Sequence, residues 1–316
     1  MLRQALLWLS EHQGVFRMVR RNRLARRMAS RFVAGESVEE GVAVAAALAP
    51  RGITTSLDLL GESVHHAAAA EAAAAHYVAL LDQLAGTPGV EVNASVKLTQ
   101  MGFDLDEELC FRNVARILDR AAHHGGFVRL NMESSAYTQR TLDFFAARLL
   151  PAYGRDRVGV VIQSALRRSP DDVRRLIHLG ARVRLCKGAY LEAPEVAFPD
   201  KADVDRQYVE LMELLLREGH YPALATHDEA ILTRARTFVG QEGIAPDGFE
   251  FQMLYGVRRD LQEHLRAAGH RMRVYVPFGG QWYPYLMRRL AERPANLAFI
   301  LGNLVREGSS RRSTPR

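Results

Sequence analysis

A stretch near the carboxyl-terminal end, residues 283–296, combines a phenol, two guanidiniums and a carboxylate. Tyr285, Arg288, Arg289 and Glu292 stand at positions i, i+3, i+4 and i+7, so they share one face if the stretch is helical. Adjacent arginines repel each other unless an anion lies between them, and paired guanidiniums fit a carboxylate or a phosphate. This face therefore predicts an anion-binding site, with a solvated charged surface as the simpler alternative.

A second set of polar side chains follows short, apolar, strand-like runs. Each run is expected to be apolar until it ends in a residue that can form hydrogen bonds. In a parallel barrel the carboxyl ends of the strands meet at one face, where the active site lies. A purely structural protein gives no reason for this pattern around a whole ring, although any one residue could simply face water. The set comprises Lys97, Asn131, Glu133, Gln163, Arg184, Lys187, Thr226, His227, Gln252 and Tyr275.

Lys97 is a lone cation between apolar neighbours, and two kinds of chemistry fit it. It could form a Schiff base, as in aldolase-type barrels, or supply a fixed charge for an anionic substrate. Gly188 follows cations at the end of another run and would let the backbone approach a ligand closely. Asp228 is expected to cap a helix, and a hydrogen-bonding role at a ligand is expected for His227 rather than general-base catalysis.

No metal site is expected. His65 and His66 lack a partner at metal-ligand spacing, and the two cysteines, Cys110 and Cys186, allow neither a zinc site nor a disulfide framework. Two cysteines fit a reducing cytoplasm. Cys186 lies in a strand-like run and is interpreted as a core residue.

The elements that must position these residues follow a repeating strand–helix rhythm. About eight such units over roughly 250 residues are typical of a (β/α)8 barrel. A doubly wound open sheet is the alternative, but no Gly-x-Gly-x-x-Gly follows an early strand. We expect a helical segment at 1–50, a barrel domain at 51–308 and a disordered tail at 309–316. The expected strands are 53–57, 90–98, 127–131, 158–163, 182–187, 222–226, 249–253 and 273–278.

Composition bounds the class of protein. The chain of 316 residues is 48% hydrophobic and 25% charged, as in a soluble globular protein. Its net charge of +6 is spread along the sequence, which is weak evidence for nucleic-acid binding, and none is predicted. No run approaches the roughly 20 apolar residues that span a bilayer, and the first ten residues do not read as a signal peptide.

The amino-terminal segment 15–32 is dense in arginine, with apolar residues between. It can form a basic amphipathic helix. Such a helix either covers one end of the domain or contacts anionic lipid headgroups at the inner face of the cytoplasmic membrane.

Nine short motifs in a fixed order resemble those of the proline dehydrogenases. The resemblance runs from about residue 53 to 305, and each motif is weak alone but specific in combination with the others. The motifs are DLLGE at 58–62, SVKL at 95–98, RLNMES at 129–134, VVIQ at 160–163, RLCKGAYLE at 184–192, ATHD at 225–228, FEFQMLY at 249–255, VYVPF at 274–278 and YLMRRLAER at 285–293.

The resemblance implies a fold and an activity. The fold is a distorted (β/α)8 barrel that binds FAD without a Rossmann domain, with an added amino-terminal helical segment. The implied activity is oxidation of L-proline to Δ1-pyrroline-5-carboxylate, with hydride passing from C5 of proline to flavin N5 and electrons then passing to a membrane quinone. The length is similar to that of the bacterial single-function enzymes, and pyrroline-5-carboxylate dehydrogenase is an implied partner.

The resemblance also assigns roles to residues. Lys97, Arg288 and Arg289 would hold the proline carboxylate, while Glu62 pairs with Arg289 as a gate. Tyr275, Tyr285 and Leu254 would wall the substrate ring, and Asn131 and Arg184 would be catalytic, with Arg184 near flavin N5. The flavin contacts implied are Met132, Gln163, Arg184, Lys187, Gly188, Ala189, Thr226 and His227.

One position departs from the family's pattern, because Asn131 stands where the family usually has aspartate. Asparagine can donate and accept hydrogen bonds but carries no charge, so a role that needs a carboxylate is in doubt there. Glu133, two residues on, is a candidate to supply that charge. Two rival functions remain: a flavin-free Schiff-base lyase or aldolase using Lys97 or Lys187, and a basic binding module built on the amino-terminal segment.

Overall fold

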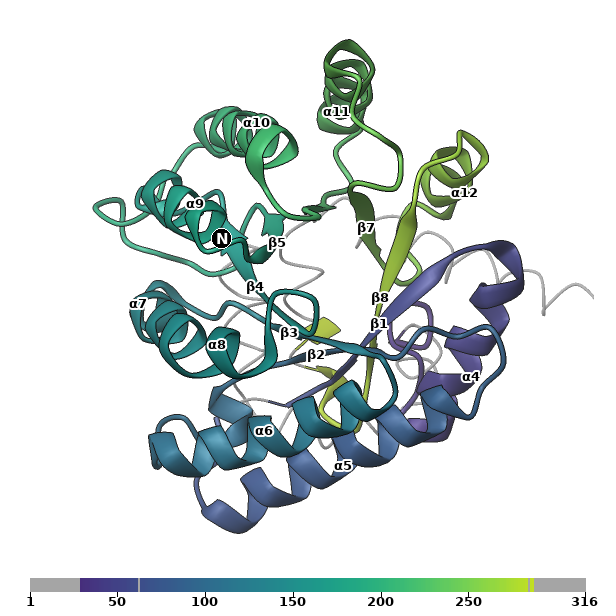
Figure 1. Ribbon diagram of the computed structural model, residues 1–316, viewed down its shortest axis with the longest axis vertical. Coiled ribbons are helices and arrows are strands. Elements are labelled where there is room, and N and C mark those ends of the chain that lie inside the picture. Colours follow the sequence, from purple (N-terminus) through teal and green to yellow (C-terminus); the bar gives the residue numbers. More distant parts are fainter. Residues whose placement is uncertain (1–28, 62, 284, 287–316) are drawn as a thin grey trace, which may run out of the picture.

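Parallel strands close into a barrel in the computed structural model, which describes residues 29–61, 63–283, 285 and 286. Within this part of the chain, eight strands pair in sequence order and the last returns to the first. The closing pair runs from Thr54 beside Arg273 to Leu59 beside Phe278. Helices surround the strands (Figure 1). The predicted (β/α)8 fold is therefore confirmed.

The strands lie close to their predicted positions. β4 has the predicted bounds, whereas β2 begins later and ends earlier than the predicted 90–98, and a 3-10 turn, Thr99–Met101, follows it. The strands are β1 Thr54–Leu59, β2 Asn93–Val96, β3 Phe127–Leu130, β4 Val158–Gln163, β5 Arg182–Cys186, β6 Ala223–Ala225, β7 Glu250–Leu254 and β8 Met272–Phe278.

The helices begin at side-chain caps in several places. Ser37 forms a capping box with Glu40 at the start of α4, and Asp106 accepts a hydrogen bond from the Leu109 amide at the start of α6. Asp228 caps α11, as the sequence predicted. The helices are α4 Val38–Leu48, α5 Ala67–Ala85, α6 Glu107–His123, α7 Ser135–Phe144, α8 Leu150–Tyr153, α9 Ser169–His178, α10 Lys201–Glu218, α11 Glu229–Glu242 and α12 Arg259–Ala267, with a π-helical stretch, Phe145–Leu149, between α7 and α8.

The inside of the barrel is polar, which the sequence interpretation did not anticipate. Alternate strand residues such as Val128, Leu185 and Val274 belong to the hydrophobic core, so the intervening residues point to the barrel axis. Bulky branched side chains usually fill that space. Here it holds polar and charged side chains from several strands, so the expectation that strands are apolar until their last residue is wrong. They include Ser56, Ser95, Arg129, Arg184, Glu250 and Arg273.

These interior charges are matched by specific partners. Arg273 donates from Nε to both carboxylate oxygens of Glu250 at 3.0 Å and from Nη1 to the Thr55 carbonyl at 2.8 Å. Arg129 donates to the Arg182 carbonyl at 3.0 Å. A Cβ at Gly159 would lie 2.5 Å from that same carbonyl oxygen and 3.1 Å from the Arg129 guanidinium. Glycine at 159 therefore makes the room that Arg129 needs.

The described part of the chain contains neither a candidate membrane span nor a candidate metal cluster. No helix there combines the length and the apolar character needed to cross a bilayer. The same residues contain no group of three histidine, cysteine or acidic side chains arranged to hold a metal ion. The stretches 1–28 and 287–316 lie outside the described residues, and with them most of the basic segment 15–32, the expected tail and most of the expected final helix.

Candidate active site

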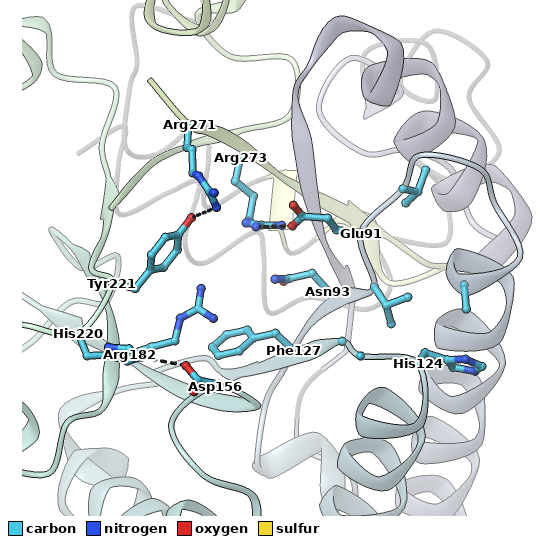
Figure 2. A pocket seen from close by; sticks show the side chains of 15 residues that line it. Glu91, Asn93, His124, Phe127, Asp156, Arg182, His220, Tyr221, Arg271 and Arg273 are labelled. Atoms are coloured by element: carbon cyan, nitrogen blue, oxygen red, sulfur yellow. Dashed lines mark hydrogen bonds and ion pairs between the residues drawn. The ribbon is translucent and has the colours of Figure 1, made fainter. Parts of the chain in front are cut away.

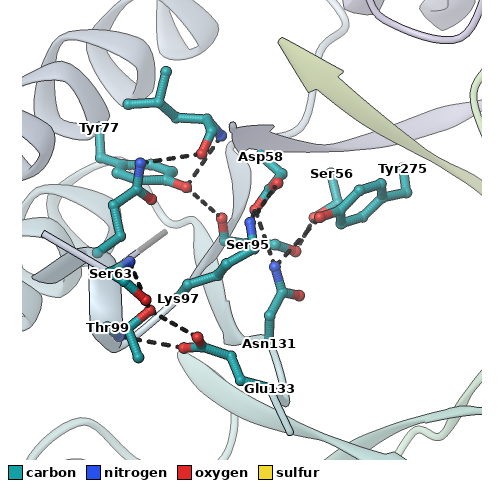
Figure 3. Close-up of polar contacts among 12 residues, drawn as sticks. Ser56, Asp58, Ser63, Tyr77, Ser95, Lys97, Thr99, Asn131, Glu133 and Tyr275 are labelled. Atoms are coloured by element: carbon teal, nitrogen blue, oxygen red, sulfur yellow. Dashed lines mark hydrogen bonds and ion pairs between the residues drawn. The ribbon is translucent and has the colours of Figure 1, made fainter. Parts of the chain in front are cut away.

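Asp58, the next-to-last residue of β1, is the centre of a polar cluster at the carboxyl ends of the strands. Its side chain is fully buried. Lys97, just after β2, places its ammonium 3.1 Å from one carboxylate oxygen, and the Asn131 amide nitrogen, just after β3, lies 2.9 Å from the other (Figure 3). One carboxylate therefore fixes two of the predicted site residues.

Asn131 bridges a carboxylate and a guanidinium. Its amide nitrogen donates to Asp58 and, at 3.3 Å, to the Tyr275 hydroxyl, while its oxygen accepts from Arg184 Nη1 at 3.1 Å. The direction of the amide follows from its partners, because a carboxylate only accepts and a guanidinium only donates. An amide can satisfy both sides at once without adding charge.

Arg184, on β5, is the guanidinium of this bridge and is buried. Its Nη2 donates to the Ser95 hydroxyl at 3.1 Å, which lies 2.9 Å from the Ser56 hydroxyl. Burial lowers the pKa of Arg184, and its Nε has no hydrogen-bond partner among the described residues. A buried donor without an acceptor is costly and indicates a missing partner.

Tyr275 closes the cluster on the β8 side. Its ring centre lies 5.3 Å from the Arg184 guanidinium carbon. Burial and the nearby Asp58 charge hold the pKa of Tyr275 well above its ordinary value, so the hydroxyl keeps its proton. Tyr285 also raises the pKa of Tyr275 and is itself buried. The two predicted substrate-wall tyrosines are therefore neighbours.

The sequence interpretation missed Asp58 as a site residue, together with Ser56 and Ser95. In the sequence Asp58 stands out only as the first residue of the DLLGE motif at 58–62. The signal that could have found it is the alternation in β1, because a charge two residues after Ser56 falls on the same face of the strand.

Glu133 does not lie beside Asn131 as a replacement carboxylate. Its side chain accepts hydrogen bonds from the Thr99 amide at 3.2 Å and from the Thr99 hydroxyl at 2.7 Å. The carboxylate that contacts Asn131 is that of Asp58. β3 has already ended at Leu130, so strand alternation does not govern where Glu133 points.

Gln163 and Gly188 lie together near the ends of β4 and β5. Gln163 is buried and donates to the Glu133 carbonyl at 2.8 Å. Gly188 has a φ of +108°, and a Cβ there would lie 3.1 Å from the Gln163 side-chain oxygen, so this close approach of backbone requires glycine. Met132 is buried, and Ala189 follows Gly188 in the loop after β5.

The remaining predicted cofactor residues make contacts between elements. Lys187 pairs its ammonium with Asp205 of α10 and, at 2.8 Å, with Asp228. The Thr226 hydroxyl accepts from the Asp228 amide at 3.1 Å. These contacts direct the Lys187 ammonium to the helical layer, away from the Asn131 cluster on the barrel axis.

His227 acts as a hydrogen-bond acceptor in this structure. Its Nε2 accepts from the backbone amide of Leu254, the predicted wall residue at the end of β7, at 2.9 Å. A ring nitrogen that accepts carries no proton, so the proton of a neutral ring lies on Nδ1. This agrees with a positioning role. Glu62, Arg288 and Arg289 lie outside the described residues, so their predicted roles stay predictions.

Comparison with known proteins gives one consistent result. A model of the proline dehydrogenase family matches residues 42–301. A proline dehydrogenase of Deinococcus radiodurans is 42% identical over 307 residues, which cover 96% of this chain and 98% of that protein. Proline dehydrogenase 2 of Bacillus subtilis is 37% identical over 307 residues, covering 96% and 99%.

A solved structure agrees with the fold. The crystal structure of proline utilization A from Bdellovibrio bacteriovorus, inactivated by N-propargylglycine, superposes with a TM-score of 0.79 at 27% identity. The match covers 88% of this chain and 34% of that longer one. Because the family model spans most of the sequence and the relatives match along nearly their whole length, the chain belongs to the proline dehydrogenase family.

Proposed function

We propose that this proline dehydrogenase uses FAD to oxidise L-proline to Δ1-pyrroline-5-carboxylate, the first step of proline catabolism to glutamate, and passes the electrons to a membrane quinone. The observation that carries the proposal is the cluster in which Asn131 joins Asp58, Tyr275 and Arg184. The cluster brings together the Lys97 ammonium, the neutral Tyr275 phenol and the Arg184 guanidinium, whose Nε has no partner among the described residues.

The described residues fit a flavin. Arg184 Nε is buried without an acceptor among the described residues, as expected for a donor whose acceptor belongs to a bound cofactor. The Gly188 backbone approaches Gln163 more closely than a side chain would allow. We assign cofactor binding to Met132, Gln163, Arg184, Lys187, Gly188, Ala189, Thr226 and His227. When bound, FAD supplies the two-electron oxidant, and the protein supplies binding and orientation.

For the substrate, we assign Lys97, Arg288 and Arg289 to the proline carboxylate and Tyr275, Tyr285 and Leu254 to the ring. Several cations around one carboxylate fix the orientation of a small substrate. Asp58 holds the Lys97 ammonium at 3.1 Å, so this cation is positioned before substrate arrives. Glu62 is proposed to pair with Arg289 as a gate.

We also propose a cytoplasmic enzyme whose basic segment, 15–32, rests on the inner face of the membrane where the quinone lies. The product is the substrate class of pyrroline-5-carboxylate dehydrogenase, which is the proposed partner. No role for a metal ion or nucleic acid is proposed.

The absorption spectrum of the purified protein tests the function. We expect a bound-flavin spectrum that is bleached by anaerobic L-proline, is unchanged by D-proline and returns when a quinone is added. Protein that is colourless and does not take up added FAD would contradict the proposal. It would favour the flavin-free lyase in which Lys97 forms a Schiff base. Bleaching that only oxygen reverses would remove the quinone from the scheme and leave the dehydrogenase.

Asn131→Asp should raise the KM for L-proline several-fold while changing kcat little. The substitution adds a negative charge beside Asp58 and Arg184, and that charge repels the substrate carboxylate. Steady-state kinetics across pH measure this, and the KM difference from the parent should widen as the added carboxyl ionises. Pyrrolidine, which lacks the carboxylate, should be unaffected by the change. An equal effect on pyrrolidine and proline would show that the added charge does not act through the substrate carboxylate.

A further inference from the structure

A cavity of about 610 Å3 opens at the opposite end of the barrel, among the amino-terminal ends of the strands. We call it the amino-terminal pocket. Its lining includes Asn93, Phe127, Arg182, Tyr221, Arg271 and Arg273 (Figure 2). Known (β/α)8 enzymes place their chemistry at the other end, so a ligand here would not be the substrate of the active site.

Arg182 is the unusual member of this lining. Its guanidinium carbon lies 4.3 Å from the ring centre of Phe127 and 4.2 Å from that of Tyr221, and Figure 2 draws it between the two rings. Its Nε is buried with no hydrogen-bond partner, and no acceptor among the described residues pairs with its other nitrogens. Packing against rings leaves the in-plane N–H groups available, which are the groups that bind carboxylates and phosphates.

The other charged groups of the pocket already have partners. Arg273 binds Glu250 and, at 2.8 Å, Glu91, whereas Arg271 donates to the Tyr221 hydroxyl at 3.1 Å. Asp156 accepts from His220 at 2.9 Å. Among the residues that the structure describes, Arg182 is therefore a cation without a hydrogen-bond acceptor, and the acids of the pocket are paired with other groups.

Asn93 adds a second unused polar group. The residue is buried, lines the pocket and makes no side-chain hydrogen bond to the described part of the chain. An amide that lines a cavity without a partner among the described residues is available to a bound molecule or to solvent. Figure 2 shows it on the opposite side of the cavity from Tyr221.

Tyr221 holds the Arg182 stack in a strained conformation. Its φ is +46°, a region that residues other than glycine seldom adopt. The hydroxyl is fixed by Arg271 and by a 3.3 Å hydrogen bond to Glu250. Such strain is retained where the surrounding contacts determine it, and it is frequent at ligand-binding sites.

We propose that the amino-terminal pocket binds a small organic anion, whose carboxylate or phosphate group is held by the in-plane N–H groups of Arg182 and the amide of Asn93. The volume is that of an ordinary small-molecule site. Binding gives the Arg182 guanidinium the hydrogen-bonded counter-ion that no described residue provides. The site is separate from the proline site and needs neither flavin nor substrate.

Isothermal titration of the full-length protein with inorganic phosphate and with succinate, at ionic strength matched with sodium chloride, tests the proposal. We expect saturable binding of one of the two, and the one that binds identifies the group recognised. Arg182→Lys keeps the charge but loses the planar fork, so affinity should fall at least about tenfold. Arg174→Lys is the control, because Arg174 lies on α9 with its side chain 64% exposed.

Glu91→Gln gives a test that does not depend on loss of binding. It removes a half-exposed carboxylate that engages Arg273 at the pocket, so affinity should rise several-fold. The proposal is overturned if neither anion binds saturably, if Arg182→Lys binds as tightly as the Arg174→Lys control, or if Glu91→Gln weakens binding. Because no step uses proline, failure here would leave the proposed oxidation untouched.

Discussion

Asp58→Asn should lower the free energy of unfolding by about 3 kcal/mol and reduce kcat/KM for proline by about ten- to a hundredfold. The loss of stability follows because Lys97 would be left buried at 8% exposure without its counter-ion. The loss of activity follows because Lys97 and Asn131 both lose the acceptor that positions them. Urea unfolding and steady-state kinetics measure the two effects.

Lys97→Met is the second single variant needed for a double-mutant cycle with Asp58→Asn. If the ion pair is the cause, the double variant Asp58→Asn with Lys97→Met should lose less stability than the sum of the two single variants, because it buries no unpaired charge. Simple additivity would mean that Asp58 and Lys97 act independently. The kinetic effect of the double variant should remain large, since the substrate would still lack the Lys97 cation.

Glu250→Gln should remove an acid-sensitive part of the protein's stability. Burial alone would raise the pKa of Glu250, but the charge and hydrogen bonds of Arg273 outweigh it and lower the pKa to about 2. A carboxyl whose folded pKa lies below its ordinary value of 4.5 stabilises the fold above that value, and the benefit is lost as the pH falls towards the folded pKa. The difference corresponds to about 3 kcal/mol.

Urea unfolding between about pH 7 and about pH 3 measures this slope. The parent protein should lose stability steeply on the acid side, whereas Glu250→Gln should start lower at neutral pH and change less. Glu263→Gln is the control, because Glu263 forms an exposed pair with Arg51 and exposed pairs contribute little. If Glu250→Gln and the parent lose stability in parallel as the pH falls, the Glu250–Arg273 pair does not carry the acid sensitivity.

The parts of the fold that sequence could predict were those with strong local signals. β4 is a continuous buried run and matches its predicted bounds, and α6 begins at the Asp106 cap, a residue type that favours the start of a helix. A loop separates β1 from α5, which begins at Ala67. Ser63 in the intervening loop has a φ of +45°, and no residue pattern announced that turn.

The candidate site divides in the same way. Lys97 and Asn131 were found because each is polar at the end of an apolar run, whereas Arg184 and Tyr275, also expected at strand ends, lie in the middle of β5 and β8. Asp58 was missed because its role depends on Lys97 and Asn131, which lie 39 and 73 residues away in the sequence. One sequence does not show which distant strands are neighbours in the barrel. The interior arginines Arg129 and Arg273 were missed for the same reason. An arginine within a strand is expected to be exposed to solvent unless its partner inside the barrel is known.

The polar barrel interior has a consequence for how the chain reaches this structure. Every side chain of a strand changes face if its pairing slips by one residue. In an aliphatic barrel such a slip exchanges one apolar residue for another and leaves a competing misfolded state of similar energy. Here a one-residue slip of β7 or β8 would place Glu250 or Arg273 in the hydrophobic layer between the strands and the helices. The charged side chain would then be separated from its ion-pair partner. The buried charges therefore raise the free energy of barrels with a shifted strand register, which disfavours these misfolded states during folding.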